Sequence, residues 1–181
     1  MKETGYSLFT TSYGVGGAIS SKAGLVEIIL PFTGLGEPEL RAEILSRYPA
    51  ARENWWYSTK AAEELQGYFA GELAAFSLPL DLEHLSVFGK AVSRYVAGIA
   101  YGEVRTYAEV AAASGSPRAS RAVGSIMAAN RLPVIIPCHR VVSSNGSMCG
   151  YSAPGGVATK RLLLEMEGVT FSSFGRIKRS E

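Results

Sequence analysis

The hydrophobic pattern of the chain changes its period near residue 82, and this change limits the possible folds more than any other feature. Before it, short runs rich in β-branched and aromatic residues are separated by glycine and serine: Ser7–Thr10, Val15–Ile19 and Leu25–Leu30. Such runs predict strands of a small antiparallel sheet. Helical patterns follow at Pro38–Arg47 and Thr59–Ala70, and Phe76–Leu80 fits either a last strand or a linker. In the second helix, the apolar stripe is Ala61, Leu65, Tyr68 and Phe69, with Glu63 and Glu64 on the opposite side.

Beyond a boundary placed near Asp81–Glu83, the pattern becomes helical. One long apolar face consists of Val87, Phe88, Ala91, Val92, Tyr95, Val96 and Ile99. A short helix over Tyr107–Ala113 and a turn at Ser114–Ser116 follow. A third helix is expected to start with Ser116 as N-cap and Pro117 in its first position. Two helices joined by a short glycine-containing turn are typical of a helix-turn-helix. We therefore expect an α/β (α+β) protein, with a sheet-and-helix support domain over 1–82 and a mainly helical domain over 83–181.

The charge is divided unevenly between the two halves. Residues 1–83 contain 6 Lys and Arg against 11 Asp and Glu, whereas residues 84–181 contain 12 against 5. The balances of −5 and +7 suggest that the second half meets a polyanion such as nucleic acid. Chance clustering of solvated charges explains the numbers equally well.

The third helix presents two contrasting faces. Residues on the face assigned to the core are Ala119, Ala122, Val123 and Ile126. The other face holds Arg118, Arg121 and Ser125, flanked by Gly124 and Ala128. Small side chains allow the backbone to approach a partner closely, while arginine supplies a long planar cation. This face suits a nucleic-acid groove; the alternative is an ordinary solvated surface.

The densest chemistry surrounds Cys138, which follows the apolar run Val134–Ile136 and Pro137. We expect this run to be a buried extended segment, so that Cys138 stands where a strand gives way to a loop. A cysteine reacts as thiolate, and the adjacent His139 could accept its proton through a turn or a water. Glu165 and Glu167 are both candidates to orient that histidine. The alternatives are a buried structural cysteine and a hydrogen-bonded structural histidine; the spacing does not favour zinc.

These residues resemble the O6-alkylguanine-DNA alkyltransferases, also called methylated-DNA–protein-cysteine methyltransferases. The segment Pro137–Val141 matches the PCHRV signature of that family. Further matching blocks occur in order at Tyr101–Val104, Thr106–Tyr107, Ser120–Gly124, Asn130, Gly150–Ser152 and Glu167–Gly168. The resemblance covers most of residues 84–169, while the N-terminal part is similar only in size and coarse pattern.

The resemblance implies a suicide DNA-repair protein. An alkyl group from O6-alkylguanine, with O4-alkylthymine as a second candidate lesion, would pass irreversibly to Cys138. His139 would act as base through a water, Glu167 would orient His139, and Asn130 would tie the helix-turn-helix to the active-site segment. The resemblance also implies that the third helix enters the DNA minor groove without sequence preference, that the damaged base flips out, and that Arg121 fills its place.

The remaining implied contacts form two groups. The residues implied to contact DNA are Arg121, Tyr107, Arg118, Ser125 and Ser120. Those implied to line the substrate pocket are Tyr107, Val141, Tyr151, Ser152 and Cys149. Tyr107 would donate a hydrogen bond to the guanine ring. Two departures stand out: Cys149 occupies a position that is commonly glycine in the family, and Ala153–Pro154 is inserted before Gly155. Both changes are expected to narrow or stiffen the pocket.

Several absences complete the expectations. Residues 1–83 contain no cysteine and no histidine, so we expect no structural zinc, and we expect no cofactor. With only Cys138 and Cys149, no disulfide framework is expected. The first residues lack a long apolar stretch, so we expect a cytoplasmic or nucleoid-associated protein without a membrane segment. We also expect a monomer. Two other readings remain open: a non-catalytic module that recognises damaged DNA, and a helix-turn-helix regulator that binds a defined sequence.

Overall fold

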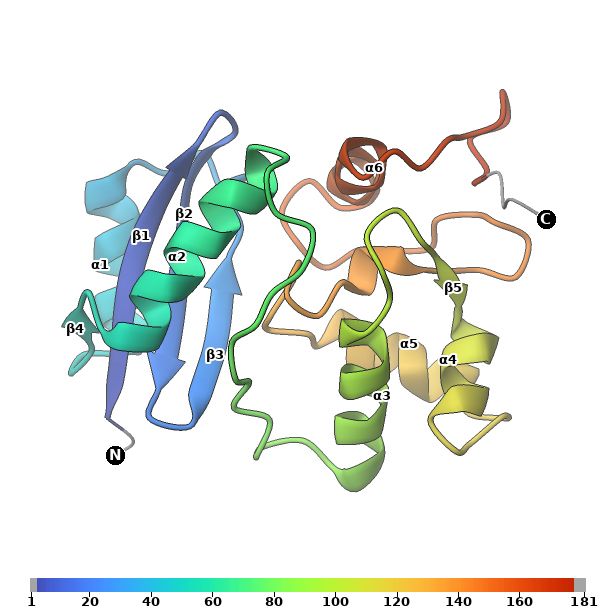
Figure 1. Ribbon diagram of the computed structural model, residues 1–181, viewed down its shortest axis with the longest axis horizontal. Coiled ribbons are helices and arrows are strands. Elements are labelled where there is room, and N and C mark those ends of the chain that lie inside the picture. The colour runs from blue at the N-terminus through green and yellow to red at the C-terminus, as the bar shows by residue number, and fades with distance from the viewer. Residues whose placement is uncertain (1–2, 178–181) are drawn as a thin grey trace. The chain divides into compact units, whose positions relative to one another are not determined.

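The computed structural model describes residues 3–177, apart from the side chain of Trp56. The chain separates into two compact units, one ending at His84 and the other beginning at Leu85 (Figure 1). The expected boundary lay two residues earlier. The mixture of helices and strands confirms the α+β class. Within residues 3–177, no helix is both long enough and apolar enough to cross a membrane.

The first unit is built on a four-stranded sheet with the order β3-β2-β1-β4. Its strands are β1 (Thr4–Thr11), β2 (Gly14–Ser21), β3 (Gly24–Ile29) and β4 (Arg52–Glu53). The first three pair antiparallel, as expected, while the short β4 runs parallel to β1. The expected strand or linker at 76–80 is irregular and makes one bridge, between Leu80 and Leu25.

Two helices cover opposite faces of this sheet, α1 (Glu37–Arg47) and α2 (Trp56–Phe69) (Figure 1). Tyr6 of β1 packs in the core cluster that includes Leu40 and Ile44 of α1. The next residue, Ser7, points the other way, because side chains alternate along a strand, and its hydroxyl lies 3.1 Å from that of Ser58 on α2. The stripe expected on α2 is buried.

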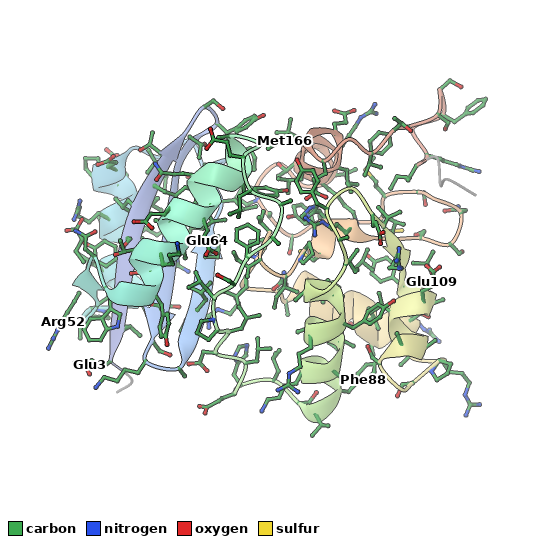
Figure 2. The ribbon with its side chains drawn as sticks, viewed as in Figure 1. Glu3, Arg52, Glu64, Phe88, Glu109 and Met166 are labelled. Carbon is green, nitrogen blue, oxygen red and sulfur yellow. The ribbon has the colours of Figure 1, made fainter. Side chains whose placement is uncertain are left out.

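One expectation for α2 is wrong. Glu64, labelled on α2 in Figure 2, was expected on the side opposite the apolar stripe, but it is only 8% exposed. Its carboxylate accepts a hydrogen bond from the Ser77 hydroxyl at 3.0 Å. The segment that follows the helix therefore folds back over this side of α2, which the helical period alone does not reveal.

The second unit contains five helical elements and a two-stranded ladder. Its elements are α3 (Val87–Ala97), β5 (Arg105–Thr106), α4 (Tyr107–Ala113), α5 (Ser120–Ala128), the 3₁₀ turn η1 (Cys138–Arg140), β6 (Val141–Val142) and α6 (Val157–Met166). Val87 was expected in the apolar face of α3, but it is 88% exposed. It is the first residue of the helix, where the N-cap Ser86 accepts a hydrogen bond from Gly89 N.

The helix-turn-helix is formed by α4 and α5. Thr106 is the N-cap of α4, and its hydroxyl accepts a hydrogen bond from Glu109 N. The carboxylate of Glu109, labelled in Figure 2, in turn accepts a hydrogen bond from Thr106 N. The expected start of the next helix at Ser116 is wrong: residues 116–119 form a turn closed by Ala119 N and Ser116 O, and α5 begins at Ser120. This shorter helix buries Val123 and Met127, whereas Ala122, expected in the core, is exposed.

The ladder between β5 and β6 brings distant segments together. Arg105 pairs with Val141 and Thr106 with Val142, in parallel. Because α4 starts directly after β5 and η1 ends directly before β6, Tyr107 and Cys138 reach the same region of the unit. The extended segment expected at Val134–Ile136 does not form. These residues lie in a tight turn, in which Val134 adopts a left-handed backbone with φ of 73°.

Candidate active site

A pocket of about 830 Å³ opens between the helix-turn-helix and the loop that follows β6. Its lining residues are Tyr107, Ser120, Arg121, Gly124, Ser125, Met127, Ala128, Cys138, Cys149, Gly150, Tyr151 and Ser152. All of them belong to the second unit. The pocket therefore joins one buried thiol to the face of α5 that sequence analysis assigned to nucleic acid.

The tight turn before η1 positions Cys138. The amide nitrogen of Asn130 donates to Ile136 O at 2.8 Å and to Cys138 Sγ at 3.2 Å. Its side-chain oxygen accepts from Leu132 N at 3.0 Å. Since Asn130 follows α5, one side chain connects the turn and the sulfur to the end of this helix.

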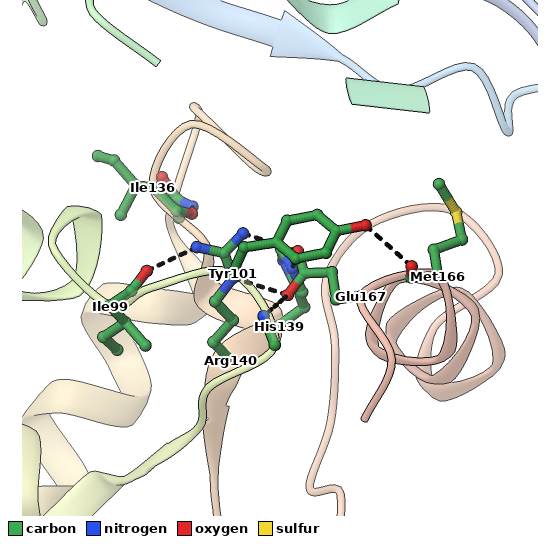
Figure 3. Close-up of polar contacts among 9 residues, drawn as sticks. Ile99, Tyr101, Ile136, His139, Arg140, Met166 and Glu167 are labelled. Carbon is green, nitrogen blue, oxygen red and sulfur yellow. Dashed lines mark hydrogen bonds and ion pairs between the residues drawn. The ribbon is translucent and has the colours of Figure 1, made fainter. Parts of the chain in front are cut away.

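A buried charged cluster includes His139 and Arg140, the two residues that follow Cys138 in the chain (Figure 3). His139 Nε2 and Glu167 Oε1 are 2.8 Å apart. Arg140 donates to both oxygens of the same carboxylate, through Nε at 2.8 Å and Nη2 at 2.7 Å. It also donates to Ile99 O at 2.6 Å, and its guanidinium lies over the Tyr101 ring. Glu167 is thus the partner of His139.

These contacts set the protonation states of the cluster. Burial opposes ionisation of Glu167, but hydrogen bonds from His139 and Arg140 prevail and lower its pKa to about 2. Burial lowers the pKa of His139, although Glu167 opposes this shift. Burial also raises the pKa of Cys138, against the hydrogen bond from Asn130 and the charge of Lys160. At neutral pH, a neutral imidazole therefore stands beside a largely protonated thiol.

The histidine is oriented for proton transfer. Because Nε2 is engaged with the Glu167 carboxylate, it carries the hydrogen, and Nδ1 is left as the acceptor. Nδ1 is buried and has no hydrogen-bond partner within residues 3–177. The 3₁₀ turn places Cys138 and His139 in consecutive positions of a bend rather than on opposite faces of a strand. A basic nitrogen is thus available in the turn that bears the thiol.

Most, but not all, of the expected site residues meet at the pocket. Tyr107, Ser120, Arg121, Ser125, Cys149, Tyr151 and Ser152 line it together with Cys138. Val141, expected in the pocket, has a fully buried side chain that is not part of the lining. Arg118 is exposed but precedes α5, outside the lining. Glu165 pairs with Arg161 instead of His139.

Two buried cations near the site were not predicted from the sequence. Arg140 lies within the signature itself, and Lys160 is only 1% exposed on α6. A signal for Lys160 was present: Lys160, Leu163, Leu164 and Glu167 recur at the spacing of one helix face, and the leucines mark that face as core. A charged residue in such a stripe indicates a buried polar cluster. For Arg140, nothing in the local pattern distinguishes a buried guanidinium from an exposed one.

Cys149, in the loop after β6, lines the same pocket as the buried thiol of Cys138. It is exposed, unlike Cys138, and its sulfur contacts the Ser143 hydroxyl. The insertion Ala153–Pro154 follows, and Pro154 O accepts a hydrogen bond from Thr159 near the start of α6 at 2.5 Å. Both departures from the family pattern thus belong to the loop that borders the pocket.

Comparison with known proteins agrees with this geometry. Residues 87–169 match the model described as 6-O-methylguanine DNA methyltransferase, DNA binding domain. The chain is 43% identical over 116 residues to a methylated-DNA–protein-cysteine methyltransferase of Methanosarcina acetivorans, covering 64% of this chain and 72% of that protein. This chain belongs to the methylated-DNA–protein-cysteine methyltransferase family.

Solved structures of this methyltransferase family extend the similarity to the first unit. The Mycobacterium tuberculosis O6-methylguanine methyltransferase superposes with a TM-score of 0.71 at 32% identity, covering 91% of this chain and 92% of that one. A crystal structure of M. tuberculosis OGT in complex with DNA gives the same TM-score at 31% identity, over 90% and 92%. The sheet-and-helix unit is therefore part of the common fold, although its sequence alone showed only a coarse resemblance.

The buried carboxylate generates a prediction about acid stability. In the folded chain the pKa of Glu167 is about 2, below its usual value of 4.5, so its ionised form favours folding at neutral pH. That contribution, on the order of 3 kcal/mol, is lost as pH falls from about 5 towards 2. Glu167→Gln should therefore be less stable than wild type at pH 7, with a difference that shrinks in acid. Urea unfolding at a series of pH values measures it.

Glu165→Gln is the matched control for this prediction. It removes a carboxylate two residues away whose side chain is 47% exposed, and exposed pairs contribute little to stability. A stability difference between wild type and Glu167→Gln that stays constant from pH 7 to pH 3 would contradict the assignment of the ionised carboxylate.

Proposed function

We propose that this chain repairs alkylated DNA by moving a methyl or other alkyl group from the O6 atom of guanine to Cys138 Sγ, once per molecule. One observation carries the proposal: a thiol backed by an oriented histidine opens into a pocket whose rim bears Arg121 of the helix-turn-helix. Family membership and the methyltransferase activity named for the Methanosarcina acetivorans relative support it. DNA in the crystal structure of a relative supports the choice of partner.

The proposed chemistry begins with the Cys138 proton. His139 Nδ1 accepts it through a water, while Glu167 and its hydrogen bond to Nε2 stabilise the resulting imidazolium. Asn130 donates to the sulfur and so favours the thiolate. The thiolate attacks the alkyl carbon, the carbon–O6 bond breaks, and its electron pair returns to the guanine, which takes up a proton. The thioether that forms is stable, so the protein is consumed.

The substrate base must leave the duplex to reach Cys138, because the sulfur lies at the bottom of a pocket. Extrusion of a base costs a few kcal/mol and costs less for a damaged pair. Arg121, exposed on α5 at the pocket rim, would occupy the emptied position in the stack. Tyr107 and Tyr151 would donate hydrogen bonds to the flipped guanine. Burial raises the pKa of both phenols, which keeps them protonated as donors.

We propose that the side of α5 that lines the pocket enters the DNA minor groove. Ser120, Gly124, Ser125 and Ala128 lie along the exposed side of α5, so this helix can approach a narrow groove closely. The minor groove carries little sequence information, and binding would be salt-dependent and nearly independent of sequence. Arg118, in the turn before α5, would contribute as a phosphate contact. We propose that the protein acts as a monomer, because the whole pocket lining lies in one compact unit of the chain.

The decisive experiment is intact-protein mass spectrometry after mixing the chain with duplex DNA that contains O6-methylguanine. We expect one added methyl group per protein molecule, mapped to Cys138 and absent in Cys138→Ser. Cys149→Ser is the control, because this variant should still gain one methyl group and that group should still map to Cys138. Persistently methylated DNA beside unmodified wild-type protein would reject the enzyme reading and favour a non-catalytic module that only binds the lesion.

Arg121 should matter for duplex DNA alone. Removal of its side chain in Arg121→Ala leaves the flipped state without a filler, so transfer from duplex DNA should slow by about 10- to 100-fold, equivalent to about 1–3 kcal/mol. Transfer from free O6-methylguanine base should change little, because no flipping is needed. Arg118→Ala is the matched control, with weaker binding but a normal transfer rate at saturation. Equal slowing of both substrates by Arg121→Ala would show that the residue acts elsewhere.

Cys149 should restrict the size of the transferred group. The Cys149 side chain stands in the lining where the family commonly has glycine, so the pocket should accept methyl groups readily and benzyl groups slowly. We expect Cys149→Gly to raise the rate of benzyl transfer more than that of methyl transfer. Single-turnover kinetics with both lesions measure the ratio. Rapid benzyl transfer by the wild type, unchanged in the variant, would contradict this assignment.

A further inference from the structure

Lys160 is a buried cation that the proposed mechanism does not yet use. It lies on α6, is 1% exposed, and its ammonium donates a hydrogen bond to Val141 O at 2.6 Å. Val141 directly follows η1, the turn that bears Cys138 and His139. The hydrogen bond therefore fixes a positive charge beside the reactive turn, in the interior of the second unit.

No acidic side chain accounts for this charge. Within residues 3–177, Lys160 takes part in no salt bridge, and Glu167, the nearest buried carboxylate in sequence, is engaged by His139 and Arg140. A buried ammonium without a carboxylate is costly, because desolvation is not repaid by an opposite charge. A fixed buried cation can stabilise negative charge that develops during a reaction.

The ionisable groups around Lys160 identify that negative charge. Electrostatic coupling links the ammonium to Cys138 and Cys149, whose ionised forms favour it, and to His139, whose protonated form disfavours it. Around Cys138 itself, the other influential groups are Asn130, which donates to the sulfur, and the phenol of Tyr151. Burial lowers the pKa of Lys160 to about 8, so the side chain is still mainly charged at pH 7.

We infer that Lys160 is a positioning residue for alkyl transfer: its ammonium, held on the Val141 carbonyl, stabilises the negative charge that develops on Cys138 Sγ. The effect of Lys160 on alkyl transfer rests on the proposed function. Its effect on ionisation of the Cys138 thiol does not require DNA. The negative charge of the Cys138 thiolate offsets the positive charge of the Lys160 ammonium. The same ammonium repels an imidazolium at His139, so the thiolate is the charged group that Lys160 stabilises. Lys160 thus favours the step in which the sulfur ionises and attacks.

The experiment follows the reactivity of Cys138 towards iodoacetamide from pH 6 to pH 10, without DNA. Peptide mapping separates Cys138 from Cys149. In Lys160→Met, which keeps the shape but loses the charge, we expect Cys138 to react about tenfold more slowly at neutral pH, with its pH inflection raised by roughly one unit. Lys160→Arg should restore most of the wild-type profile, since it keeps the charge and a donor for Val141 O.

Thr159→Val provides the matched structural control. Thr159 is the neighbouring buried residue of α6 and donates to Pro154 O, so its replacement perturbs the same helix without removing a charge. We expect the pH profile of Cys138 to stay at its wild-type position in this variant. Thermal melts identify which variants are folded, and Lys160→Gln takes the place of Lys160→Met if the latter does not fold.

The possible outcomes separate this inference from the proposed function. A wild-type inflection in the neutral Lys160 variant, or an equal shift in Thr159→Val, would overturn the electrostatic role. Failure of wild-type protein to accept a methyl group from DNA would instead overturn the proposed function and leave the thiol titration valid. Methyl transfer in Lys160→Met should fall by about the same factor as the alkylation rate; an unchanged transfer rate would remove Lys160 from the mechanism.

Discussion

The second unit depends on the hydrogen bonds that the buried carboxylate of Glu167 makes with His139 and Arg140. The carboxylate oxygens form hydrogen bonds with His139 and Arg140, and Arg140 also donates a hydrogen bond to the Ile99 carbonyl (Figure 3). One anion thus joins the end of α6, the turn η1 and the segment after α3. Fully buried charges persist only where they are paired and hydrogen-bonded. Because the same contacts orient the histidine, the fold and the chemistry cannot be separated at this residue.

Two devices connect this cluster to the DNA-facing surface. The parallel ladder of β5 and β6 places the start of α4, with Tyr107, beside the segment that leaves η1. Asn130 ties the end of α5 to the sulfur through a single amide group. The helix that carries Arg121 is therefore held in a fixed position relative to the thiol. A reaction that occurs once gains from such preorganisation, since the geometry needs no adjustment after the base arrives.

Sequence patterns predicted what depends on local periodicity. The three long strands and α1, α2, α3 and α4 were predicted close to their observed positions, and burial confirms the apolar stripe of α2. Errors occurred where a separate segment or a local turn overrides the periodic pattern. Glu64 is covered by a segment that folds back, the residues before Cys138 turn although they are apolar and β-branched, and α5 starts at Ser120 because Ser116 closes a turn instead of capping a helix. The first error concerns a contact with a separate segment, whereas the other two concern local turns that the apolar pattern does not indicate.

The candidate site was predictable in its motif but not in its electrostatics. The signature around Cys138 indicates the chemistry. The residues alone left Glu165 and Glu167 as candidates to orient His139. The structure separates them, because Glu167 contacts His139 whereas Glu165 pairs with Arg161. Burial holds the thiol and the imidazole neutral at rest, while Asn130 and the cation of Lys160 lower the cost of ionising the sulfur. A neutral resting state protects a thiol that can be used only once, because thiols react with electrophiles and oxidants mainly as thiolates. The same burial that slows unwanted reactions therefore requires a fixed cation nearby, so that the sulfur can still ionise when a base enters the pocket.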